Sequence, residues 1–154
     1  MRTYLVPLLA GLALAVSAFL PWVHVDGETL AGFPGTTALW VIGLGLTSAL
    51  LAILSLITRR NSRHPLLIVG LVALGITGLS FRLLPRTVEE QALTRSQAIA
   101  IVRGTPEAER PEASAAVGLY VGIAASLLIV GFGLTIVIKQ VATPYAVDDP
   151  NDDV

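Results

Sequence analysis

Four long stretches of this sequence contain no Asp, Glu, Lys or Arg, and they restrict the chain to a membrane fold. They cover residues 3–25, 30–58, 65–81 and 113–138. A charged side chain at the centre of a bilayer costs roughly 2.5 to 3.5 kcal/mol on insertion scales, so uncharged runs of this length are typical of transmembrane helices. The composition agrees, with 54% hydrophobic residues, 14% charged residues and a mean hydropathy of +0.76.

We predict an all-α membrane protein whose residues 1–154 form a single domain, a four-transmembrane-helix bundle. The expected helices lie at about 4–20, 37–58, 65–84 and 114–138. The third is long enough only if Arg82 snorkels outward, and Pro85 is expected to end it. The first helix also resembles a secretory signal peptide. We expect it to be retained, because cleavage would leave three spans and place the Arg-rich loop on the wrong side.

The short loop at 59–64 sets the orientation, because it holds three Arg in six residues. The positive-inside rule places this loop and both termini in the cytoplasm. Nine of the ten basic residues are Arg, a bias that is typical of GC-rich bacterial genomes, so the bacterial inner membrane is the expected location. The expected membrane-interface anchors are aromatic at the outer side and basic at the inner side: Trp22, Trp40, Tyr120, Arg59, Arg60 and Arg63.

The outer side holds two structured loops. Apolar and polar residues alternate around Asp26-Gly27, the preferred pair for a type I′ turn, which predicts a small β-hairpin. In the outer loop, residues 85–113, Thr87 begins a capping box and Gly104 is suited to a helix C-terminus, so a separate surface helix is expected at about 88–103. The cytoplasmic tail, residues 139–154, is acidic and expected to be solvated.

Catalytic chemistry has little support in this sequence. There are no cysteines, and the two histidines, His24 and His64, are expected on opposite sides of a hydrocarbon layer about 30 Å thick. Each is only a weak candidate for binding a pigment or haem. We therefore expect no enzyme activity, no metal site and no cofactor. The net charge of −1 gives no indication of a nucleic-acid partner.

Small residues recur at four-residue spacing on two of the expected helices. Because lipid is as apolar as leucine, membrane helices associate where small side chains let their backbones approach closely. The fourth helix could use this stripe against the chain's own first helix or against a partner subunit. The expected helix-packing residues are Gly11, Ala15, Ser114, Gly118, Gly122 and Ser126.

The segment Phe19-Leu20-Pro21-Trp22-Val23, followed by a Gly-rich hairpin and a second apolar span, resembles small uncharacterised bacterial tetraspan membrane proteins. The topology also resembles the claudin-type plan, with inner termini and an outer hairpin after the first helix. The claudin Gly-Leu-Trp and paired-cysteine signature is absent, so this resemblance implies neither a junction-forming function nor any functional residue.

The leading functional hypothesis is a non-catalytic accessory or scaffold subunit. Its expected partners are the lipid bilayer and a larger membrane protein complex, or further copies of this chain. Two alternatives stay open: a pigment- or haem-associated membrane subunit using His24 or His64, and a small transporter or channel formed between chains.

The orientation can be tested because the chain has no cysteine of its own. Cysteines introduced as Asn61→Cys and Thr105→Cys should react with a membrane-impermeant thiol reagent from opposite sides, because the Arg-rich loop resists translocation. In intact cells only Thr105→Cys should be labelled. Labelling of Asn61→Cys from outside would contradict the predicted orientation.

Overall fold

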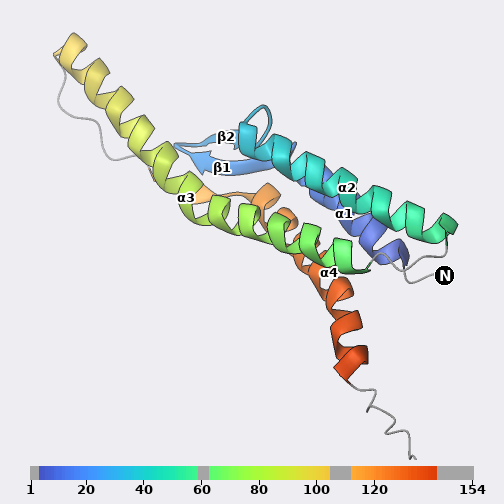
Figure 1. Cartoon of the computed structure of the whole chain (residues 1–154). Coiled ribbons are helices and arrows are strands. Elements are labelled where there is room, and N and C mark those ends of the chain that lie inside the picture. Colours follow the sequence, from blue (N-terminus) through green and yellow to red (C-terminus); the bar gives the residue numbers. More distant parts are fainter. Residues whose placement is uncertain (1–3, 59–62, 105–111, 142–154) are drawn as a thin grey trace, which may run out of the picture.

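The computed structural model describes residues 4–58, 63–104 and 112–141. Within these residues the chain forms four helices and a small sheet (Figure 1). The helices are α1 Leu5–Ser17, α2 Thr36–Thr58, α3 Arg63–Arg103 and α4 Val117–Val141. The strands are β1 Pro21–Val25, β2 Glu28–Ala31 and β3 Ala113–Ala115.

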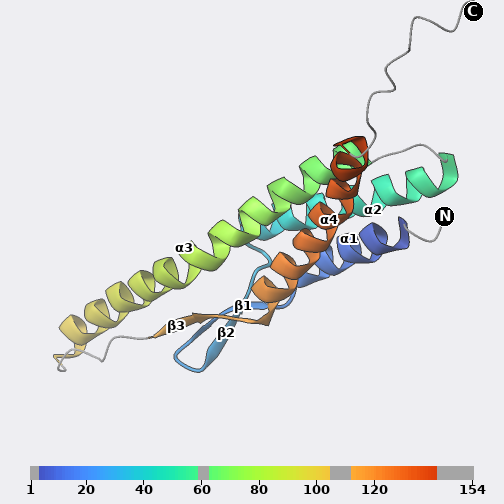
Figure 2. The same ribbon diagram turned by 90° about the horizontal axis from the view of Figure 1, so that it is seen from below.

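The helices pack in the cyclic order α1, α2, α3, α4. α1 lies between α2 and α4, and α3 packs along α4 and also touches α2 (Figure 2). Their shared core is built from fully buried apolar side chains on all four helices: Leu14, Val41, Leu66, Leu119 and Ile129.

Three helices, α2, α3 and α4, are long and apolar enough to cross a membrane. α1 is apolar but has 13 residues, and at 1.5 Å per residue it is about 20 Å long. The expected helix at 4–20 is therefore too long at its C-terminal end. Pro21 disfavours helical geometry at Leu20, and the strand β1 begins at that proline.

The sheet has the order β2-β1-β3, with both pairings antiparallel. The predicted hairpin is confirmed: Asp26 and Gly27 have φ angles of 48° and 80°, as a type I′ turn requires. Strand β3 was not expected, because Ala113 was assigned to the outer loop and the next two residues to the start of the fourth helix. Pairing with β1 holds them in extended conformation, so α4 begins at Val117 instead of residue 114.

The third helix differs most from expectation, because α3 is one helix of 41 residues that continues through Pro85. The predicted helix end at Pro85 is wrong. Residues 88–103 are helical as predicted, but they continue α3 and do not form a separate helix. The Thr87 hydroxyl donates to the carbonyl oxygens of Leu83 and Leu84 at 2.9 and 3.0 Å, a pairing within the helix and not a cap. The predicted end at Gly104 is confirmed, with a φ of 64° following Arg103.

We call residues 85–103 of α3 the arm. Figure 1 shows the arm extending well beyond the ends of the other helices, on the same side as the hairpin. Val88 and Ala92 pack against the core cluster that includes Val25 and reaches Ala113 and Ala115. The sheet therefore braces the base of the arm.

The fold can be tested at Trp22, which is 2% exposed and donates its indole N–H to the Ser17 carbonyl oxygen at 2.8 Å. Trp22→Phe should lower the free energy of unfolding by about 2 kcal/mol, because it removes buried volume and the shorter of the two hydrogen bonds to that carbonyl, leaving it only the Leu20 N–H at 3.3 Å. Trp40→Phe is the matched control, since Trp40 is 66% exposed, and it should change stability by less than about 0.5 kcal/mol. Unfolding of both variants in one detergent gives the comparison. Equal losses would show that Trp22 does not hold the fold together.

Candidate functional site

The small residues of α4 lie against other parts of the same chain. A Cβ atom on Gly118 would stand 2.6 Å from Trp22 Cδ1, 2.7 Å from the Pro21 carbonyl oxygen and 2.9 Å from that of Ser17. On Gly122 it would stand 3.2 Å from both the Ser17 hydroxyl oxygen and Thr77 Cγ2. This part of the stripe thus faces the end of α1, the start of β1 and α3.

The other predicted packing residues lie in different surroundings. Gly11 lies against α2, where its Cβ would come within 2.7 Å of the Gly45 carbonyl oxygen, and a Cβ on Gly45 would stand 2.7 Å from the Ala15 nitrogen. Ser126 is buried, and its hydroxyl donates to the Gly122 carbonyl oxygen at 2.9 Å. Ser114 belongs to β3 and not to a helix, so the four-residue stripe loses its first member.

The expected membrane-interface anchors differ in their exposure. Trp40 and Tyr120 are 66% and 56% exposed, and Tyr120 stacks edge-on against Phe81 with ring centroids 5.3 Å apart. Trp22, in contrast, is buried within the chain and not exposed at its surface, and the absence of a side chain on Gly118 leaves room for its indole. Arg59 and Arg60 lie outside the described residues, as does the acidic tail from 142 onward. Arg63 is the first residue of α3, and its side chain is not described.

The two histidines do not share a site. His24 lies in β1 on the exposed face of the sheet, opposite Thr29 of β2 and Ser114 of β3. His64 is exposed at the other end of the structure, one residue into α3. Among the described residues there is also no group of three or more His, Cys, Asp or Glu that could hold a metal ion.

The buried polar side chains of the described residues are all hydroxyls: Ser17, Ser48, Ser55, Thr77, Ser80 and Ser126. Most donate to carbonyl oxygens of their own helix; Thr77, for example, donates to Ala73 at 2.8 Å. The Ser48 hydroxyl has no hydrogen-bond partner in the described part of the chain. Ser48 lies in the close contact between α1 and α2, because a Cβ on Gly11 would be 3.2 Å from its Cβ. Its small size therefore serves helix packing.

A cleft of about 640 Å³ lies between the hairpin and the arm. The hairpin contributes Val25, Asp26, Glu28 and Leu30, and the arm contributes Val88, Gln91, Ala92, Arg95, Ser96 and Ile99. The cleft therefore joins apolar side chains to two carboxylates on one wall and a guanidinium on the other. Sequence reasoning found both walls but kept them apart, because it ended α3 at Pro85.

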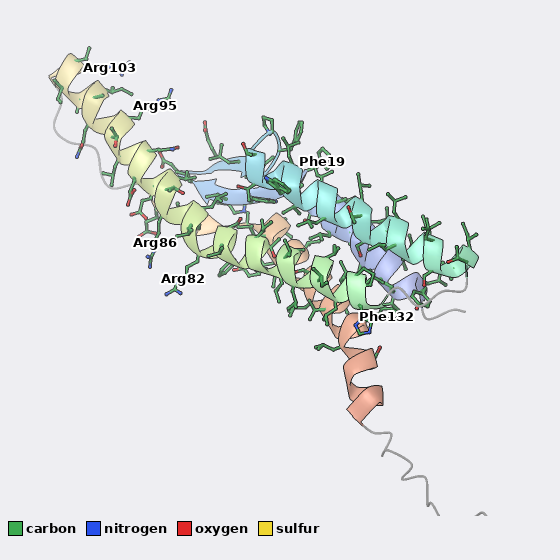
Figure 3. All side chains as sticks on the ribbon, in the orientation of Figure 1. Phe19, Arg82, Arg86, Arg95, Arg103 and Phe132 are labelled. Atoms are coloured by element: carbon green, nitrogen blue, oxygen red, sulfur yellow. The ribbon has the colours of Figure 1, made fainter. Side chains whose placement is uncertain are left out.

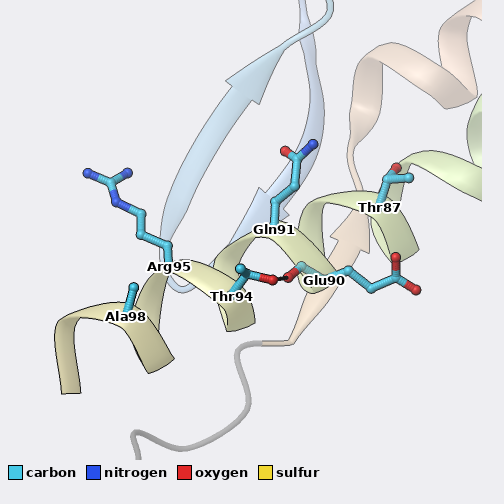
Figure 4. Close-up of a pocket in the computed structure, with 6 residues that line it drawn as sticks. All are labelled: Thr87, Glu90, Gln91, Thr94, Arg95 and Ala98. Carbon is cyan, nitrogen blue, oxygen red and sulfur yellow. Dashed lines mark hydrogen bonds between the residues drawn. The ribbon is translucent and has the colours of Figure 1, made fainter. Parts of the chain in front are cut away.

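The arm also exposes much of its own surface. Figure 4 shows Gln91 and Arg95 rising from the arm on the side of the hairpin strands, while the Thr94 hydroxyl donates to the Glu90 carbonyl oxygen at 2.8 Å. Near the tip, Ile101 and Val102 are 82% and 87% exposed, the two most exposed large apolar side chains of the described residues. Figure 3 places Arg103 beside them at the end of the arm, and Arg82 and Arg86 where the apolar part of α3 ends.

Comparison with protein-family models, with curated proteins and with solved structures finds no match for this chain. The contacts and exposed surfaces of the chain itself therefore carry the functional inference. Two features stand out: the cleft beside the hairpin and the apolar tip of the arm.

The glycine contact on α4 gives a sharp test of how the helices pack. Gly118→Ala should lower the free energy of unfolding by about 1 to 3 kcal/mol, because a methyl group would collide with the Pro21 carbonyl and with Trp22. Gly131→Ala on the same helix meets no atom within 4 Å and should leave stability unchanged or slightly higher. Thermal unfolding of the two purified variants measures the difference. Similar melting temperatures for the two variants would indicate that Gly118 faces lipid and does not pack against Trp22.

Proposed function

We propose that this protein is a non-catalytic accessory or scaffold subunit of a larger membrane protein complex. In this proposal the helices form a four-helix membrane bundle in a bacterial inner membrane, with both termini cytoplasmic. α1 crosses as the shortest span, and Ala18, which keeps helical backbone geometry, extends it slightly. The sheet and the arm then lie on the outer side.

One observation carries the proposal: a helix continues beyond the apolar region and ends in exposed apolar side chains. From Arg82 to Arg103 the helix rises by roughly 30 Å. On the helical body exposed apolar residues such as Leu9 and Ile57 have lipid to face, but the tip of the arm does not. Ile101 and Val102 would therefore be exposed to water unless another protein covers them.

The bracing of the arm supports the same function. A helix that projects alone into water is marginally stable, and most helical stability in proteins comes from packing. Val88 and Ala92 supply that packing at the base of the arm. The arm is thus suited to hold an apolar contact at a fixed distance from the bundle, as a scaffold subunit requires.

The proposal is tested by mass spectrometry of what co-purifies with the full-length chain in mild detergent. The double variant Ile101→Ser/Val102→Ser should reduce a stoichiometric partner by about tenfold or more, because the loss of two buried apolar side chains amounts to several kcal/mol. Its melting temperature should stay unchanged, since both side chains are exposed in the isolated chain.

Ala98→Ser is the matched control, because it adds one hydroxyl to an exposed position one turn earlier on the arm. It should retain the partner. Equal recovery of the partner with the double variant and with the unmodified chain would show that the tip of the arm does not contact the partner. The absence of any stoichiometric partner for the unmodified chain would contradict the accessory function itself.

A further inference from the structure

The outer strand of the sheet has an open edge. β2 lies at one side of the order β2-β1-β3, and among the described residues no strand pairs with its far side. Val25 and Glu28 flank the two-residue turn and form the first pair of the hairpin. Because hydrogen-bonded and non-hydrogen-bonded pairs alternate along an antiparallel ladder, the N–H and C=O of Thr29 point away from β1.

The side chains of β2 divide between the two faces of the sheet. Glu28 and Leu30 line the cleft beside the arm, and Thr29 lies on the opposite face with His24. All four residues of β2 are exposed, and Leu30 keeps 44% of its surface open. A fourth strand added beside β2 would thus place every second side chain over the cleft.

The cleft has the chemistry to select such a strand. Its apolar surface includes Leu30 and Ile99, each 44% exposed. Asp26 and Glu28 stand at the turn of the hairpin, and Arg95 lines the opposite wall of the cleft. Two acidic groups against one basic group leave an excess of negative charge beside the open edge, which favours a cationic side chain in the ligand.

We propose that the β2 edge and the cleft bind an extended polypeptide segment of a partner as a fourth strand of the sheet. Main-chain hydrogen bonds to Thr29 supply affinity, as in other cases of strand addition to a sheet edge. Selectivity comes from an apolar side chain between Leu30 and Ile99 and from a basic side chain two residues away, beside Glu28. This site deepens the proposed function, on which it rests for the presence of a partner, but it is separate from the tip of the arm.

The probe is a fluorescein-labelled peptide, Thr-Val-Thr-Lys-Thr-Val-Thr, which presents Val and Lys on one face of a strand. Its counterpart carries Glu in place of Lys. Binding is measured by fluorescence anisotropy to the full-length chain in phosphatidylcholine nanodiscs, with empty nanodiscs as the blank. The Lys peptide should bind more tightly than the Glu peptide, and Glu28→Gln should reduce that preference.

Thr29→Pro removes the outward N–H without removing a hydrogen bond of the hairpin, so it should weaken binding by about tenfold. Thr29→Val keeps that N–H and is the matched control, with binding expected within about twofold of the unmodified chain. Amide hydrogen exchange on the unmodified chain tests the same site without any substitution. The bound peptide should slow exchange at Thr29.

Several results would overturn the proposal: no binding above empty nanodiscs, unchanged binding by Thr29→Pro, or no protection of the Thr29 amide. Dimerisation of the chain that Thr29→Pro abolishes would also overturn it, by assigning the edge to a second copy. The Ile101→Ser/Val102→Ser variant should still bind the peptide. Failure of the strand site and failure of the accessory function are therefore distinguishable.

Discussion

The position of Trp22 is the constraint on which the rest of the structure depends. Its indole N–H satisfies the Ser17 carbonyl at the end of α1, and its ring lies beneath Gly32 and against Gly118 of α4. One buried side chain thus ties together the end of α1, the start of β1 and the close approach of α4. The indole hydrogen bond is shorter than the one that the Leu20 N–H donates to the same carbonyl at 3.3 Å, and a ring of this size buries a large area, so both contributions favour the same arrangement.

The positions of the sheet and the arm follow from that contact. β1 starts at Pro21 and pairs with both β2 and β3. Directly after β3, the Ala116 N–H donates to the Trp22 carbonyl oxygen at 2.8 Å. The inner face of the sheet then provides the surface on which Val88 and Ala92 pack. The base of the arm has packing partners because the sheet is present, and the sheet is placed by the tryptophan.

Sequence reasoning succeeded where a local pattern has one strong physical meaning. Asp26-Gly27 allows positive φ at two successive residues, and Gly104 allows it once, so the hairpin and the end of α3 were predictable. It failed where tertiary contacts decide between two local options. Pro85 and Thr87 are typical of a helix boundary, yet both are accommodated inside α3, and Ala113–Ala115 is a strand only because β1 is beside it. The cleft could not be foreseen, since it needs both the continuous helix and the hairpin.

A single continuous α3 is central to this account, because a bend at Pro85 would move the tip of the arm and open the cleft. The distance between spin labels on Leu71→Cys and Val102→Cys measures it directly, since both positions are exposed and the chain has no other cysteine. At 1.5 Å per residue, a continuous α3 should give a narrow distribution centred at about 47 Å. A broad distribution, or one centred well below this value, would show that the helix breaks at Pro85 and would contradict the account.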